Sequence, residues 1–207
     1  MLRPLLLLLM LWIPHQDVVT PPPTVAPAPS DAPAYTADGQ LKLPANYREW
    51  VFLSSGVDMS YNPSDAAMNH SMFDNVFVNP TSYKAFKDTG TWPDKTTLVL
   101  EVRGSETDAS INKRGHTQSA EIMGFEVHVK DAKLPGGWGF FQFDNEVSAR
   151  LTQRPSSCYT CHEQHAAVDT TFVQFYPTLL ALAKKKGTLS AEYLKEIAAP
   201  ATPTSSK

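Results

Sequence analysis

The chain has 207 residues, a length that suits one domain with appendages better than two full domains. Hydrophobic residues make up 42% and aromatic residues 10% of the sequence, which is enough for a substantial core. The 18 basic and 21 acidic residues give a formal net charge of −3. Nucleic-acid and anionic-membrane partners both favour a basic surface, so this near balance supports neither, and we expect no nucleic-acid partner.

The N-terminal residues place one positive charge, Arg3, before an apolar run over residues 5–13. This run is too short to cross a bilayer as a helix, but it has the length of the apolar part of a signal peptide. A buried N-terminal helix and an uncleaved anchor remain alternatives, because no A-x-A cleavage pattern follows. We therefore assign residues 1–20 to a signal peptide or N-terminal anchor and expect a periplasmic location.

Residues 21–40 are a Pro/Ala-rich stretch, and most of the 17 prolines gather towards this end of the chain. Such a composition favours extended conformations and cannot bury enough apolar surface to fold. We interpret it as a linker that leads into a folded domain over residues 41–190. Residues 191–207 are expected to form a short helix and a disordered tail.

The first elements predicted in the domain are a strand over residues 73–78 and a helix that begins at Asn79-Pro80 and ends at Gly90. Strands over residues 96–103, 124–130 and 138–143 follow, with alternating or β-rich composition. A helix from Pro177 to the lysines before Gly187 closes the domain. Several strands with few helices predict an α+β fold, mainly an antiparallel β-sheet with a few helices packed against it.

The two cysteines of the chain lie in the motif Cys158-Tyr159-Thr160-Cys161-His162, between the last strand and the closing helix. C-x-x-C-H is the attachment signature of haem c. Cysteines about one helical turn apart can both reach the vinyl groups on one edge of a porphyrin. The imidazole of His162 follows directly and can bind the iron from the same side. The motif predicts one haem c, bound covalently through Cys158 and Cys161, with His162 as axial iron ligand in a C-terminal haem-binding segment.

Three other roles of the cysteine pair fit less well. A thioredoxin-like pair belongs at the start of a helix in a βαβ pattern, which is not the context here. A zinc site needs further ligands at regular spacing, and only His165 is close by. An exported protein with one cysteine pair often carries a disulfide, but a disulfide over so short a loop would stabilise little.

Several segments of the sequence resemble the cytochrome P-460 family, which includes the cytochromes c′-beta. Residues 158–180 (CYTCHEQHAAVDTTFVQFYPTLL) resemble its haem-binding end, residues 43–51 (LPANYREWV) resemble its entry segment, and the segments between them occur in the family's order. The resemblance covers residues 41–183. It implies a largely antiparallel β fold, usually a homodimer, with a five-coordinate haem iron that is open to a small ligand such as nitric oxide.

The resemblance also bears on catalysis. Family members that oxidise hydroxylamine carry a lysine cross-linked to the haem. Aligned on Asp94 and Glu101, the corresponding position here is Leu100, which cannot form the cross-link. The nearest lysine, Lys95, precedes the strand in a turn. This departure favours an unmodified haem of the cytochrome c′-beta type.

We predict that Leu100 lines an apolar distal pocket, and that Phe73 and Phe77, which share one face of their strand, belong to the same pocket. An apolar pocket favours neutral diatomic ligands, because charged ligands are costly to desolvate there. Several side chains could supply a sixth iron ligand by type, but for each a surface or core position is the better interpretation, and His128 is expected to face solvent. These candidates are His70, His116, His128, His165 and the internal methionines.

The sequence thus predicts an exported mono-haem c-type cytochrome that binds nitric oxide or a similar small nitrogenous ligand and exchanges electrons with a redox partner cytochrome. Two alternatives stay open. One is a hydroxylamine-oxidising enzyme with a modified haem, which Leu100 disfavours. The other is a simple electron carrier with a six-coordinate haem. No residue is assigned a catalytic role.

Overall fold

The computed structural model describes residues 30–61, 71–144 and 147–199. The predicted signal peptide or anchor over residues 1–20 lies outside the described residues, as do the first part of the predicted linker and residues 200–207. The elements described below belong to one unit, Asp31–Lys207.

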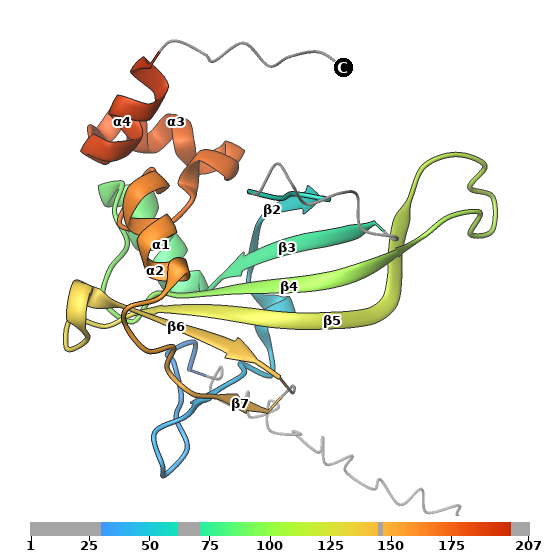
Figure 1. Ribbon diagram of the computed structural model, residues 1–207, viewed down its shortest axis with the longest axis horizontal. Helices are drawn as coiled ribbons and strands as arrows, with labels where there is room; N and C mark the ends of the chain where they lie inside the picture. Colours follow the sequence, from blue (N-terminus) through green and yellow to red (C-terminus); the bar gives the residue numbers. More distant parts are fainter. Residues whose placement is uncertain (1–29, 62–70, 145–146, 200–207) are drawn as a thin grey trace, which may run out of the picture. The chain divides into compact units, whose positions relative to one another are not determined.

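Five antiparallel strands form the main sheet, in the order β2-β3-β4-β5-β6 (Figure 1). Each strand pairs with its neighbour along the chain, and α1 (Pro80–Thr89) is inserted between β3 and β4. A two-stranded pair joins β1 (Leu41–Lys42) to β7 (Ser148–Ala149). The predicted α+β class with a mainly antiparallel sheet is confirmed. The strands of the main sheet are β2 (Val51–Val57), β3 (Met72–Val78), β4 (Thr97–Glu106), β5 (Thr117–Lys130) and β6 (Trp138–Phe143).

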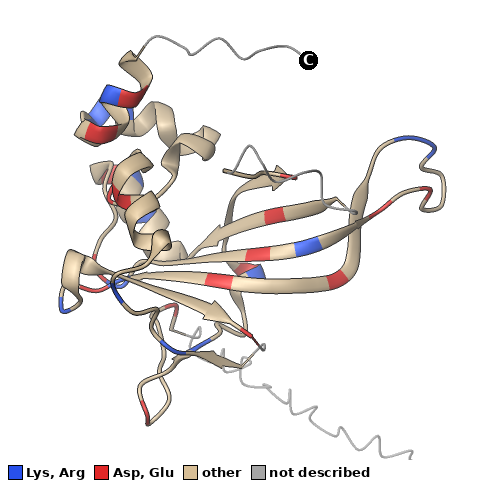
Figure 2. Cartoon of the chain, viewed as in Figure 1, with Lys and Arg blue, Asp and Glu red and all other residues tan. Residues whose placement is uncertain are grey.

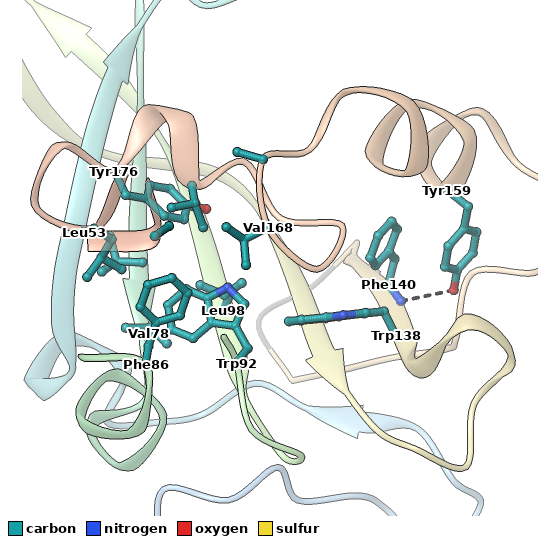
Figure 3. Packing of buried hydrophobic residues seen from close by; sticks show 14 residues of the cluster. Leu53, Val78, Phe86, Trp92, Leu98, Trp138, Phe140, Tyr159, Val168 and Tyr176 are labelled. Atoms are coloured by element: carbon teal, nitrogen blue, oxygen red, sulfur yellow. Dashed lines mark hydrogen bonds between the residues drawn. The ribbon is translucent and has the colours of Figure 1, made fainter. Parts of the chain in front are cut away.

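Both faces of the sheet are covered. On one face, residues of β3, β4 and β6 pack against the helices; Figure 3 shows this cluster, in which Phe86 of α1 meets Trp92 with ring centroids 4.2 Å apart. On the other face, Val99, Phe125 and Phe141 pack against the segment around η1 (Tyr47–Glu49). Alternation along each strand therefore divides its side chains between two buried layers.

Helix α1 begins and ends where the sequence predicts. The Asn79 side chain does not cap its own helix but accepts a hydrogen bond from the backbone N–H of Thr97 at 2.9 Å, which ties the start of α1 to β4. Gly90 ends the helix in the left-handed conformation, with φ of 80°. Its carbonyl accepts a hydrogen bond from Thr188 Oγ1 at 2.7 Å, so the end of α1 meets the residues after α3.

Three helices follow the sheet: α2 (Ser157–His165), α3 (Pro177–Lys186) and α4 (Ala191–Ala198). Short 3₁₀ turns, η2 (Pro135–Gly137) and η3 (Val173–Phe175), precede β6 and α3. The Ser190 side chain caps α4 by accepting from the Tyr193 N–H at 3.1 Å. Among the described residues, the helices are too short or too polar to cross a membrane.

The described end of the predicted linker contacts the domain. Asp31 accepts a hydrogen bond from the Thr81 N–H at 2.8 Å, at the start of α1. The N–H of Lys42 donates to the Ala34 carbonyl at 2.8 Å. At the other end of this segment, Ser148 Oγ donates to Gln40 Oε1 at 3.1 Å, so residues 31–40 are attached to the domain at both ends.

Candidate haem site

Tyr159 anchors α2 on the sheet. It is 3% exposed, its hydroxyl donates to the Thr152 carbonyl at 3.1 Å, and the same oxygen accepts from the Phe140 N–H at 3.2 Å (Figure 3). Its ring stacks on Phe140 with centroids 4.4 Å apart. Because Tyr159 lies between Cys158 and Cys161 in the helix, this anchor sets the direction in which both thiols are presented.

His162 has a defined tautomer. Its Nδ1 lies 2.8 Å from the Thr170 carbonyl oxygen, which can only accept, so Nδ1 carries the proton and Nε2 keeps its lone pair. Burial lowers the pKa of His162, against the opposing effect of this hydrogen bond. The imidazole is therefore neutral at neutral pH, with one nitrogen free, which is the form that binds metals.

Three rings surround the imidazole of His162. Their centroids lie 4.2 Å away for Phe172, 4.7 Å for Phe140 and 4.7 Å for His128. His128 also stacks on Phe140 at 4.0 Å, and burial, together with the charge of His162, holds the pKa of His128 well below its usual range. The expectation that His128 faces solvent is wrong, because the rings of Phe140 and His162 pack against it.

Two cavities of about 290 and 300 Å³ adjoin His162. Both cysteines and Ser157 line one of them, while strands β2 to β5 form the wall of the other. The side chains that line both cavities are Tyr61, Glu126, His128, His162 and Phe172. The two spaces therefore meet at the histidine of the C-x-x-C-H motif.

The wall of the strand-lined cavity is largely apolar, and Leu100 is part of it, with Leu98 and Val102 on the same face of β4. Phe77 is not: it lies on the opposite face of the sheet and packs edge-on against Tyr47 at 5.6 Å. Phe73, four residues earlier on the same strand, shares the face of Phe77. The assignment of Phe73 and Phe77 to the pocket is therefore wrong, because the residues next to them in the strand, and not these two, face the cavity. The residues of β3 that line the cavity are Met72, Asp74 and Val76.

Two carboxyl groups line this cavity, and neither was predicted from the sequence. Glu126 of β5 lies opposite Leu100, and Asp74 of β3 lies opposite Val102. Acidic residues interrupt the central strands in Figure 2. Burial, followed by the charge of Asp74, raises the pKa of Glu126, and burial, followed by the charge of Asp58, raises that of Asp74. The signal that could have found them is the pairing of the strands, which puts Glu126 opposite Leu100 and Asp74 opposite Val102.

Some of the other candidate iron ligands line a cavity beside His162, and others do not. His70 lies outside the described residues, and His116 is exposed between β4 and β5. His165 is exposed and its Nδ1 lies 2.9 Å from Glu196 Oε2. Met59 and Met72 both line the strand-walled cavity, and the Met59 sulfur packs against the backbone of Gly56.

No lysine of the described residues lines either cavity. Lys95 has φ of 66° in the turn before β4, and its Nζ pairs with Asp131 Oδ2 at 2.6 Å. The amine nearest in sequence to Leu100 is thus held before β4 by the carboxylate of Asp131, which follows β5.

The donor set fits a covalently held haem. Cys158 and Cys161 are free thiols on one turn of α2, and both line the cavity next to the free nitrogen of His162. Burial, and then the charge of Cys158, raises the pKa of the Cys161 thiol. A redox-active pair depends on a lowered thiol pKa, so this environment does not favour a thioredoxin-like role. Among the described residues, no three His, Cys, Asp or Glu side chains come together as a metal-binding cluster.

A comparison with family models finds a match to Cytochrome P460 over residues 44–173, more than half of the chain. The chain belongs to the cytochrome P460 family. Membership implies a haem cofactor, and the matched residues include both cysteines, His162 and the strands that line the cavities. No curated protein matches this cytochrome P460 homologue in a sequence search.

Proposed function

We propose that this protein is an exported c-type cytochrome with one haem attached through Cys158 and Cys161, ligated by His162, and with an open distal site for nitric oxide or a similar small neutral ligand. When bound, the haem would supply an iron that exchanges single electrons and coordinates that ligand. We further propose that it exchanges electrons with a partner cytochrome.

One observation carries this proposal. Both cysteines line one of two cavities that share His162, and Leu98, Leu100 and Val102 line the other. The chain's own residues thus attach the cofactor on one side and leave an apolar wall on the other. Such a wall admits neutral diatomic ligands more cheaply than charged ones.

The attachment is tested by haem staining and intact mass. Replacing both cysteines by alanine should abolish covalent haem, whereas Ser157→Ala, one residue before Cys158, should leave the haem-containing mass unchanged apart from the lost oxygen. His162→Ala should keep the covalent haem but change the optical spectrum of the iron. Haem that acid-acetone strips from the wild-type protein would refute covalent attachment.

The open site is tested by the ferrous spectrum. A high-spin ferrous spectrum that changes on addition of nitric oxide supports the proposal. Met72 gives a second candidate function a physical basis, because its thioether lines the cavity and could act as a sixth ligand. A low-spin ferrous spectrum that becomes high-spin in Met72→Leu would instead identify an electron carrier.

Export and assembly complete the proposal. The apolar run over residues 5–13 supports export, and cleavage would show as a mature protein that lacks it. We also propose a homodimer, which family resemblance supports and which the exposed Phe52 and Val57 on edge strand β2 favour. Analytical ultracentrifugation of the haem-containing protein would decide between monomer and dimer.

A further inference from the structure

The turn after α2 has a backbone conformation that its residues disfavour. Val168 and Thr171 form an isolated antiparallel bridge, with the Thr171 N–H 2.7 Å from the Val168 carbonyl. Between them, Asp169 and Thr170 have φ of 50° and 61°. Two successive left-handed residues define a type I′ turn, which Asn-Gly and Asp-Gly favour. A β-branched threonine at this position is an outlier, so the turn needs contacts from elsewhere to hold it.

Lys130 and Trp92 supply these contacts. Lys130, at the end of β5, donates from Nζ to Asp169 Oδ2 at 2.9 Å and to the Trp92 carbonyl at 2.7 Å. The Trp92 N–H also donates to Asp169 Oδ2, at 3.1 Å, and its Nε1–H donates to Thr171 Oγ1 at 2.8 Å. Trp92 is 2% exposed. The turn is thus attached at both ends to the core of the domain.

The same turn presents the Thr170 carbonyl to His162, whose Nδ1 proton it accepts. A hydrogen bond to the second nitrogen of a ligating histidine sets its tautomer and ring orientation and increases its basicity. The strained turn and the hydrogen bond to His162 are therefore parts of one arrangement.

We propose that Lys130, Asp169 and Trp92 are positioning residues: they hold the Thr170 carbonyl against His162 and thereby lower the reduction potential of the haem. This inference rests on the proposed function, because it takes His162 as the iron ligand. A more basic imidazole stabilises the ferric iron relative to the ferrous iron. Release of the turn should therefore raise the potential.

Lys130→Met is the decisive variant, because two effects on the midpoint potential have opposite signs. Loss of a positive charge by itself disfavours the reduced form and lowers the potential, whereas release of the turn raises it. We expect a positive shift. Lys95→Met is the matched control, since Lys95 forms a similar pair with Asp131 at 2.6 Å without touching the turn, and should give an unchanged or lowered potential.

A rescue separates positioning from general stability. Asp169→Ala should also raise the potential. Adding Thr170→Gly should return it towards the wild-type value, because glycine adopts the left-handed conformation without supporting contacts and keeps the backbone carbonyl. Asp169→Asn keeps an acceptor for the Trp92 N–H and a residue that tolerates positive φ, so it should show a smaller shift. If Asp169→Ala does not fold, Asp169→Asn and Lys130→Met carry the test.

A second readout does not use the haem. In the full chain prepared without haem and labelled with ¹⁵N-histidine, His162 should favour the Nδ1–H tautomer by about tenfold, and Lys130→Met should reduce this preference. Unchanged potential and tautomer in Lys130→Met, with covalent haem intact, would overturn the inference alone. Absence of covalent haem in the wild type, or a His162→Ala spectrum identical to wild type, would instead overturn the proposed function.

Discussion

Leu100 and Glu126 lie opposite each other on β4 and β5, and both side chains line the cavity beside His162. A lysine in place of Leu100 would put an amine next to a carboxyl group, as an opposite-charge pair across two strands. The position that the family resemblance assigns to a cross-linking lysine is thus one that a lysine could occupy in this sheet.

Under the proposed placement of the haem, we expect Leu100→Lys to fold, bind haem and show a changed ferrous Soret band, because the added amine would lie beside the porphyrin. Val102→Lys is the matched control, since it places the same amine two residues further along the same face of the cavity. The control should keep the wild-type band. Equal spectra for the two variants would show that position 100 has no special relation to the haem edge.

The two carboxyl groups of the cavity predict a pH-dependent preference among ligands. Burial raises the pKa of Glu126, so this carboxyl becomes charged only at a higher pH than an ordinary glutamate does. Azide should bind the ferric protein about tenfold more weakly once Glu126 is ionised, whereas neutral nitric oxide should bind the ferrous protein equally across this range. Optical titrations at several pH values measure both affinities.

Glu126→Gln should make azide binding less dependent on pH, because it removes one of the two carboxylates that line the cavity. Glu163→Gln is the control: Glu163 pairs with Arg154 at 2.6 Å on α2 and does not line the cavities. A pH dependence that survives in both Glu126→Gln and Asp74→Asn would show that neither carboxyl controls ligand entry.

Glu101, on the face of β4 opposite the cavity, predicts a different response to pH. Its buried carboxylate accepts from Arg103 Nε at 2.7 Å and from Asn75 Nδ2 at 3.2 Å, and it also binds Tyr47 and Arg48. Burial alone would raise the pKa of Glu101, but these hydrogen bonds and the charge of Arg48 hold it below its usual range. A lowered carboxyl pKa stabilises the fold above the ordinary carboxyl range, and this contribution is lost as the pH falls through the lowered value.

Glu101→Gln should therefore reduce the free energy of unfolding by about 3 kcal/mol at neutral pH, because it leaves a partly buried arginine without its carboxylate. The difference from wild type should shrink as the solution is acidified. Glu106→Gln, at the exposed end of the same strand, should change little. Denaturant unfolding at neutral and acid pH checks both statements, and a constant difference at all pH values would contradict them.

Gly90 and Gly187 allow one comparison within the fold. Both end a helix in the left-handed conformation, with φ of 80° and 70°. A Cβ at Gly187 would meet no atom within 4 Å, whereas a Cβ at Gly90 would lie 2.8 Å from Lys186 Cβ. Gly187→Ala should cost about 1 kcal/mol from the backbone alone, and Gly90→Ala should cost more. Equal losses in thermal unfolding would mean that α3 moves away freely.

Much of the fold follows from local signals. The strand over residues 138–143 matches β6, and Asn79-Pro80, Gly90, Pro177 and Gly187 mark the ends of α1 and α3. These signals are local because a proline or a left-handed glycine limits the backbone wherever the chain packs. Strand β2 was not predicted: its Ser-Ser-Gly centre has little β character, and its pairing with β3 is what makes it a strand.

The cavity was harder to predict, because alternation divides a strand into two sets of side chains without saying which set faces the cofactor. The aromatic set, Phe73 and Phe77, looked more like a pocket than the set that includes Asp74. Both layers of this sheet are buried, so polarity does not separate them as it would in a sheet with one solvated face. His128 was placed in solvent for the same reason.

The rings around His162 have a consequence for the electron exchange proposed for this protein. Phe172, Phe140 and His128 lie within 4.7 Å of the imidazole, and the Thr170 carbonyl holds its far nitrogen. Under the proposed ligation of the haem iron by His162, an imidazole confined in this way would have little room to turn when the charge on the iron changes. The reorganisation energy contributed by this side of the site should therefore be small, and electron self-exchange correspondingly fast.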